Sequence, residues 1–385
     1  QIPEDELLDV GVRNFDANIP ADIANDPEAL AKKRIYPDIR KAEARYIPSM
    51  VRSTLESSGQ WGAVRVVPSN VEFIDVVVSG KIIESTGAKL AVDVSVSDST
   101  GRVWIANKRY ESAADTGSYK TDASLKARDP FQNVYSQIAN DMVTARDAFG
   151  AEARRDIRRV TELRFATDLA PQAMLGYLAR DEKGMIKVAR LPANDDPYTQ
   201  RITRIRESDG SVVDTVDGYY ANFSEQMRDS YGSWRRSSFE EIEKETRARN
   251  QARTRTFLGA AAVLASVFVP GQCQTYDYNC RRIESAARTA GAIGGTAAVL
   301  SGLKKYSDAK IHAQQLKELS QTFQGEVAPQ VVDIEGRTLR LTGTAEEQYR
   351  EWRALLRQLY LEETGGVSRG TPAVPAPTAA AEPKS

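Results

Sequence analysis

Two short apolar segments, Phe257 to Val269 and Ala286 to Leu303, limit most strongly what this chain can fold into. A helix of the first segment is about 20 Å long, whereas the hydrocarbon core of a bilayer is about 30 Å thick. The second segment is longer but is interrupted by glycine. The pair therefore predicts an apolar helical hairpin in which neither segment crosses a membrane without help.

The loop between these segments contains the only two cysteines of the chain, Cys273 and Cys280. A single closed loop of this kind favours a disulfide and an oxidising compartment over a metal site, which needs further Cys or His ligands nearby. The alternative is two free thiols in a reducing compartment. The C-x-x-C spacing of redox sites is absent.

Small residues recur at helical spacing in both apolar segments and predict a face for close contact between helices. The face comprises Ala287, Gly291 and Gly295 in the second segment and Gly259, Ala262 and Ser266 in the first. Three interpretations remain open: a hairpin buried against the rest of the protein, a hairpin that dips into a membrane, and a face for self-assembly or a partner. We favour burial because no uninterrupted apolar span exists.

Charge is balanced over the chain, with 52 Lys and Arg against 53 Asp and Glu in 385 residues. This balance provides no global field that attracts nucleic acid, so we expect no nucleic-acid partner. Arginines precede each apolar segment, and they either contact lipid phosphates or form solvated helix ends. These arginines are Arg247, Arg249, Arg253 and Arg255 before the first segment, and Arg281, Arg282 and Arg288 at the second.

Residues 1–150 alternate between helical and strand periodicity and predict an α+β, sandwich-like domain. A helix is expected over Tyr36 to Ser58, bent or split at Pro48. A second helix is expected over Asp129 to Phe149. Between them, four strands are expected over residues 63–67, 75–84, 89–98 and 102–110, with a hairpin turn at 98–101.

The order of these elements resembles the small α/β domain of bacterial envelope lipoproteins. That group includes transport-auxiliary lipoproteins and the N-terminal domain of the Tol-system propeller protein. The resemblance rests on a helix followed by Val64 to Pro68, Val76 to Ile82, Leu90 to Val96 and Asp98 to Trp104, and it covers residues 9–149.

The resemblance implies an exported adaptor in the periplasm, often anchored to the outer membrane through a lipidated cysteine. No such cysteine precedes Gln1, and we interpret the start at Gln1 as a chain whose signal peptide was removed. The expected partners are other envelope proteins or a second copy of the chain. Membrane contact through residues 257–303 is a further expectation.

Residues 151–256 are strongly charged and predict a mainly helical region. A helix over Pro197 to Glu207 is expected to end at a turn formed by Asp209 and Gly210. Beyond it, an aromatic stripe recurs every three or four residues and is interpreted either as a packing face or as a groove for glycan or lipid. The stripe consists of Tyr219, Phe223, Met227, Tyr231 and Trp234.

The remaining sequence predicts three further parts. Residues 257–325 contain the apolar hairpin and a following helix, and residues 330–364 form a small ββα module whose helix begins with a capping box at Thr344 and Glu347. Residues 365–385 are rich in Pro, Ala, Thr and Ser and predict a disordered tail.

Catalytic machinery is not recognisable in the sequence. The single histidine, His312, lies in a charged helical pattern, and neither a nucleophile elbow nor a cluster of zinc ligands nor a phosphate-binding loop is present. We therefore expect a structural adaptor without enzymatic activity, cofactor or metal. A lipid- or glycan-binding carrier is the alternative, and an envelope hydrolase with unrecognised machinery is the third.

Overall fold

The computed structural model describes residues 2–119, 128–193, 196–267, 330–334 and 337–363. Most of the predicted hairpin lies outside these residues, including Cys273, Cys280, Ala287, Gly291 and Gly295. The helix predicted to follow the hairpin, His312 and the tail 365–385 lie outside them as well. Within the described residues the fold is α+β, as the sequence predicts.

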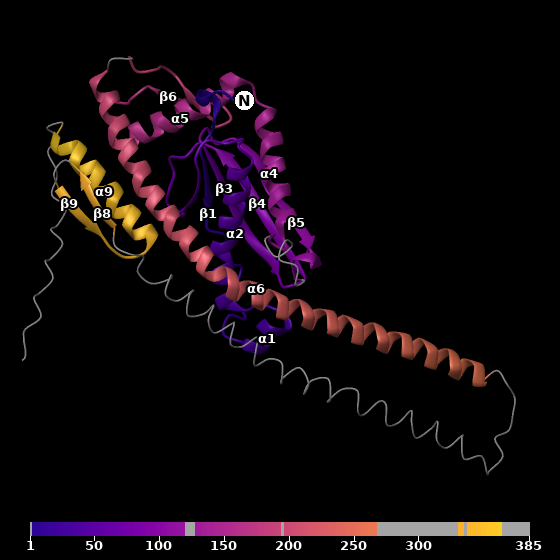
Figure 1. The fold of residues 1–385 in the computed structure, drawn as a ribbon. Coiled ribbons are helices and arrows are strands. Elements are labelled where there is room, and N and C mark those ends of the chain that lie inside the picture. The colour runs from indigo at the N-terminus through magenta and orange to yellow at the C-terminus, as the bar shows by residue number, and fades with distance from the viewer. Residues whose placement is uncertain (1, 120–127, 194–195, 268–329, 335–336, 364–385) are drawn as a thin grey trace, which may run out of the picture.

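A five-stranded mixed sheet forms the centre of the N-terminal region (Figure 1). Its order is β2 (Val64–Val67), β1 (Val10–Arg13), β3 (Val76–Ser85), β4 (Lys89–Asp98) and β5 (Val103–Ala113). Strand β1 is parallel to both neighbours, and β3, β4 and β5 form an antiparallel meander. The four predicted strands are confirmed within a few residues, whereas β1 was not predicted because a four-residue Val-Gly-Val-Arg segment carries little periodicity.

Helices α2 (Pro37–Ser57) and α4 (Gln132–Asp147) pack on one face of the sheet and bury the main core (Figure 1). Val51 and Leu55 of α2 and Ile138 and Met142 of α4 contact the buried face of the strands. The other face is polar, as is usual for a sheet with one solvated side. On that face, Arg109 of β5 donates to Asp93 of β4. A short helix, α1 (Pro27–Lys32), precedes α2, and two 3-10 turns cover Glu4–Glu6 and Thr116–Tyr119.

Pro48 neither splits nor ends α2, which continues through it. Proline has no N–H, so the carbonyl of Ala44 one turn earlier lacks its usual helical donor. The backbone N–H of Phe15, just beyond β1, donates to this carbonyl at 2.8 Å. Because of Pro48, the Ala44 carbonyl is therefore available to accept this bond, which fixes the end of the central strand against α2.

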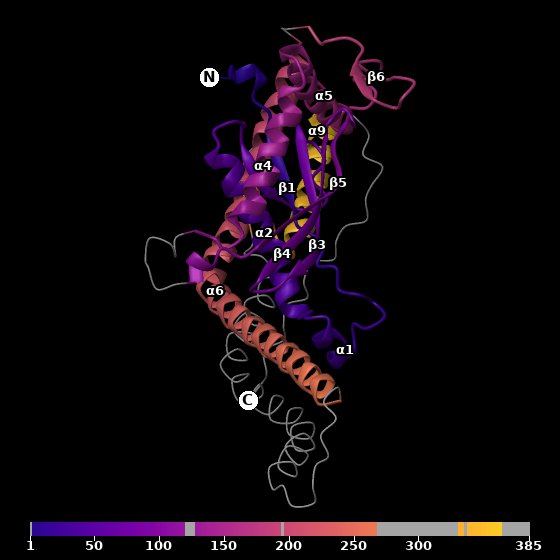
Figure 2. The ribbon, with the colours of Figure 1, turned by 90° about the vertical axis from the view of Figure 1, so that its right-hand side faces the viewer.

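Helix α5 (Ala151–Leu169) and a small hairpin of β6 (Leu178–Arg180) and β7 (Ile186–Val188) lead to α6, which runs without interruption from Pro197 to Val267 (Figures 1 and 2). The predicted turn at Asp209 and Gly210 is therefore wrong. Asp209 is buried and Gly210 lies within the helix. Val212 and Val213 continue the apolar face past this point, so tertiary burial prevails over the turn preference of Asp-Gly.

Helix α6 also covers the β2 edge of the sheet. The Asp217 carboxylate accepts the backbone N–H of Val66 at 2.7 Å, and Asp214 accepts from the side chain of Arg65. Val216 and Tyr220 are buried beside these bonds. Because an open strand edge presents unpaired N–H groups, this contact both satisfies the edge and fastens the helix to it.

The C-terminal elements β8 (Gln330–Ile334), β9 (Arg337–Leu341) and α9 (Ala345–Glu363) lie beside the N-terminal half of α6 (Figure 1). Trp352 and Leu356 of α9 are buried in a second core with Phe165 of α5 and Val213 of α6. The capping box is present: the N–H of Thr344 donates to Glu347 at 2.8 Å, and the N–H of Glu347 donates to Thr344 Oγ1 at 3.2 Å.

Past Glu245, α6 leaves the folded body and projects away from it (Figures 1 and 2). Among the described residues of α6, Glu245 makes the last ion pair with the body, at 2.6 Å from Arg34. The residues from Thr246 to Ala248 that follow it are exposed. We call residues 246–267 the arm; at 1.5 Å per residue it is about 33 Å long.

Candidate functional site

The predicted aromatic stripe is a packing face. Phe223, Met227, Tyr231 and Trp234 are buried against α2, where Tyr231 meets Tyr46 with ring centroids 5.0 Å apart. Tyr219 is half-buried at the edge of a neighbouring cluster. Since four of the five side chains are buried, the stripe as a whole is a packing face rather than an open aromatic groove, and of its residues only Trp234 also lines the first cleft described below.

The other predicted site residues are not brought together in the described structure. The backbone of Gly259, Ala262 and Ser266 lies in the last turns of α6, and their helical partners in the second apolar segment lie outside the described residues. No helix in the described part of the chain is long and apolar enough to span a bilayer.

A buried polar network occupies the place where α6 crosses α2. Glu43 of α2 is fully buried, and its Oε1 accepts hydrogen bonds from Ser85 Oγ and from the Tyr231 hydroxyl, both at 2.7 Å. Burial raises the pKa of Glu43 above its usual value, and Arg40 opposes that shift. The network joins α2, the end of β3 and α6 through one carboxylate.

Arg40 lies one turn before Glu43 and is only 3% exposed, yet its guanidinium is weakly satisfied. Its Nη1 donates to the Ile82 carbonyl at 3.4 Å, and its Nε lies 3.7 Å from Glu43 Oε2. Among the described residues, that Oε2 has no hydrogen-bond partner. A buried ion pair at such distances recovers little of its desolvation cost, which makes this pair unusual for a purely structural element.

A second ion pair lies one helical turn further along α6. Arg235 donates to both oxygens of Asp129, at 3.2 and 2.9 Å, and the Tyr46 hydroxyl donates to the same carboxylate. The guanidinium also lies 4.3 Å from the centre of the Tyr231 ring. Burial together with Asp129 raises the pKa of Tyr46 above its usual value. Here both charges are well paired, so this cluster fastens α6 to the start of α4.

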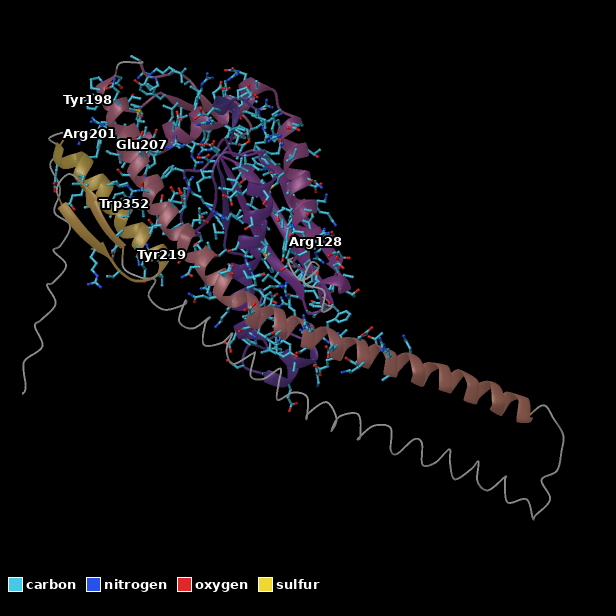
Figure 3. The ribbon with its side chains drawn as sticks, in the orientation of Figure 1. Arg128, Tyr198, Arg201, Glu207, Tyr219 and Trp352 are labelled. Atoms are coloured by element: carbon cyan, nitrogen blue, oxygen red, sulfur yellow. The ribbon has the colours of Figure 1, made fainter. Side chains whose placement is uncertain are left out.

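Two clefts open on either side of this crossing. The first, of about 870 Å³, lies between α1, the start of α2, the end of β3 and α6, and Arg40 and Trp234 line it. The second, of about 900 Å³, lies between α2, α6 and the segment before α4; Arg128, Arg228 and Arg236 line it, and Figure 3 labels Arg128. We call them the first and second cleft. Both have the size of ligand pockets, but charged and polar side chains dominate their walls.

A further polar cluster fastens α9. The buried Asp209 carboxylate of α6 accepts from Trp352 Nε1 at 3.1 Å and lies 3.6 Å from Arg353 (Figure 3 labels Trp352). Arg353 also donates to Asp168 of α5, and its guanidinium is 4.4 Å from the centre of the Phe165 ring. These contacts join α5, α6 and α9, so the role of the cluster is to hold α9 on α5 and α6.

The hydroxyl groups at the crossing are engaged as hydrogen-bond donors. Those of Ser85 and Tyr231 both donate to Glu43, and burial raises the pKa of Tyr231 well above its usual value, which keeps its proton in place. In the described part of the chain, no group of three or more His, Cys, Asp or Glu side chains is placed to hold a metal ion.

Sequence reasoning missed Arg40 and Glu43, although a signal exists. Both fall on the same helical face as Ile39, Ile47 and Tyr46, where a charged residue must be buried if the face packs. Charges on an apolar face are expensive to bury and therefore mark candidate sites.

Comparisons with models of protein families, with curated proteins and with solved structures give no match to this chain. The site is therefore interpreted from its own geometry.

Proposed function

We propose that this protein is a non-catalytic adaptor of the bacterial envelope, periplasmic or associated with the outer membrane, that links a folded body to a partner through the arm. The observation that carries the proposal is the geometry of α6. This single helix of 71 residues, about 107 Å long if straight, is fastened to the body along its first part and projects from the body along its last.

The fastening is extensive. Asp209, Asp217, Tyr231 and Arg235 each bond from α6 to a different element of the body, and all four are buried. A helix that is bonded to the body at four points along its length cannot bend freely. The body therefore fixes the direction in which the arm leaves.

The arm, by contrast, stands away from the body in both views (Figures 1 and 2). Most helical stability in proteins comes from the packing of an apolar face rather than from intrinsic helix propensity. The end of the arm carries the apolar sequence that begins at Phe257. Apolar sequence at the end of a projecting helix favours association, so the proposed role of the arm is to present it to another envelope component.

The finer organisation belongs to the same proposal. We propose that Cys273 and Cys280 form a disulfide, that the two apolar segments pair as a hairpin, and that residues 330–364 act as a small contact module. Mass spectrometry of the unreduced exported protein tests the first of these. The peptides that contain the two cysteines should be joined before reduction, and free thiols at both positions would contradict the proposal.

Site-specific photocrosslinking in a native bacterial strain tests the adaptor function. A photoreactive amino acid in place of Arg247, which is exposed near the start of the arm, should give a discrete adduct in the envelope fraction. The matched control replaces Asp229, which is also exposed on α6 but lies within the body, and should give none. Equal adducts at both positions, or none at either, would overturn the role of the arm.

A further inference from the structure

We propose that the first cleft binds a small organic anion, a molecule with one carboxylate or phosphate group and an apolar portion, whose charged group reaches Arg40. This site is separate from the arm and does not depend on the adaptor function.

The incomplete pairing of Arg40 is the first reason. Guanidinium has five N–H donors, and in the described structure Arg40 uses one of them at 3.4 Å and approaches Glu43 no closer than 3.7 Å. It is nevertheless more than nine-tenths buried and lines the cleft. A carboxylate or phosphate satisfies such a donor set in a fork-like geometry that the protein itself leaves unused.

The charges on the cleft walls are the second reason. Arg34 is already paired with Glu245, and Glu84 lies 3.5 Å from Lys89. Among the described residues, Lys32 and Lys33 have no carboxylate within ion-pair distance. The nearest carboxylate to Arg40 is that of Glu43, at 3.7 Å. Glu241 is the only acidic wall residue left without a cationic partner there. The excess in the cleft is therefore positive.

The apolar part of the cleft wall is the third reason. Tyr36 and Trp234 meet edge to face with ring centroids 6.0 Å apart, and isoleucine side chains complete this wall. The isoleucines are Ile35, Ile83 and Ile242. Aromatic and aliphatic surface next to a cation suits a ligand that combines an anionic group with a ring or short chain, and a cleft of about 870 Å³ accommodates one.

The first cleft lies where α6 makes its last contacts with the body. Its walls come from α1 and α2 on one side and from α6 between Trp234 and Glu245 on the other, directly before the arm begins. A bound anion contacts both sides and adds to the fastening of α6 at that point.

Isothermal titration calorimetry of the full chain with phenyl phosphate tests the proposal, with benzyl alcohol as the neutral comparison. Wild-type protein should bind phenyl phosphate and not the alcohol. Arg40→Lys keeps the charge but removes the planar fork and should weaken binding tenfold or more. Arg236→Gln, in the second cleft, is the matched control and should leave the affinity unchanged.

Two exposed wall residues keep the test valid if Arg40 variants fail to fold. Lys33→Gln should weaken binding about two- to fivefold, and Glu241→Gln should strengthen it by a similar factor, because each changes one charge at the cleft mouth. Absence of binding to wild type, equal shifts in the same direction for both variants, or loss of binding with Arg236→Gln would overturn the proposal.

Discussion

Glu43 shows at the residue scale how a single buried carboxylate organises a helix crossing. It receives hydrogen bonds from β3 and α6 while its own helix provides the nearest cation, Arg40. Three elements that are distant in sequence are thereby tied at one point. The arrangement is costly, because burial disfavours the charged form of the carboxyl group more than the distant Arg40 favours it.

The cost of burying the Glu43 carboxylate predicts that the stability of the protein depends on pH. Burial raises the pKa of Glu43 above the ordinary value of 4.5, so above about pH 4.5 the folded protein holds a proton that the unfolded chain has lost. The free energy of unfolding therefore falls as pH rises through this window. Glu43→Gln stays neutral and keeps an acceptor for Ser85 and Tyr231, so its stability relative to wild type should increase from pH 4.5 upward.

Urea unfolding at several pH values measures this difference. Glu56→Gln, at the exposed end of the same helix, serves as the control and should show no such increase. Parallel pH profiles for wild type and Glu43→Gln would show that the Glu43 carboxyl titrates normally.

At the scale of elements, the close approach of the β3–β4 turn to α6 fixes how the helix lies on the body. Gly87 in that turn leaves no room for a Cβ, which would overlap the Arg235 carbonyl oxygen and the Phe239 backbone nitrogen. The Gly87 N–H donates to Ser238 at 3.2 Å. Contact here is backbone to backbone, and flexible side chains cannot relieve an overlap.

Gly87→Ala should therefore displace α6 and lower the free energy of unfolding by about 1–3 kcal/mol. Thermal unfolding followed by circular dichroism measures the effect. A melting temperature equal to that of wild type would mean that α6 does not lie against this turn.

Gly210→Ala should instead raise the free energy of unfolding. Gly210 lies inside α6 with open space where a Cβ would be added, and alanine is favoured over glycine in a helix by about 1 kcal/mol. The same thermal measurement should show a small increase in stability. Destabilisation would instead support a turn at Asp209 and Gly210.

Arg353 holds α9 in the same way that Glu43 holds the crossing. Arg353→Met leaves the buried Asp209 without its cation and should cost about 3–5 kcal/mol at this interface. Limited proteolysis should then cut the chain near α9 while the sheet region stays intact. Arg350→Met on the exposed face of α9 is the control and should leave the cleavage pattern of wild type; identical patterns for both variants would contradict the fastening role.

At the scale of the whole molecule, one helix connects two cores and then extends beyond both. Helix α6 contributes residues both to the core under α9 and to the cluster on the outer side of α2, so one rigid element, rather than a linker, connects these two packed regions. The contacts of α6 with the body, which extend to Glu245, fix the direction in which the arm leaves it.

Spin labels test this rigidity. Labels at Glu225→Cys and Arg247→Cys, in a chain with both native cysteines replaced, should lie about 33 Å apart with a narrow distribution if α6 continues as a helix into the arm. The matched pair Glu207→Cys and Asp229→Cys has the same separation within the body. Pulsed electron–electron double resonance measures both distances, and a broad distribution for the first pair alone would contradict a helical arm.

Local pattern and tertiary contact contribute differently to this protein. The apolar spacing of α2 and α4, the alternation in β3 to β5 and the capping box at Thr344 are local properties, because helix and strand periodicity is encoded over a few neighbouring residues. The aromatic stripe is likewise a local periodic pattern. Its spacing does not indicate that α2 is the element that packs against it.

Contacts between residues far apart in the chain decided the elements that local pattern does not predict. Strand β1 exists because β2 and β3 flank it on both sides, and α6 passes through Asp209 and Gly210 because α9 and α5 bury that turn of helix. The weakly paired Arg40 and the cleft beside it also depend on where α6 crosses α2. Local periodicity sets the strongly patterned helices and strands, such as α2, α4 and β3 to β5. Tertiary contact sets the weakly patterned elements and which faces are buried together, because burial depends on contacts between residues far apart in the chain.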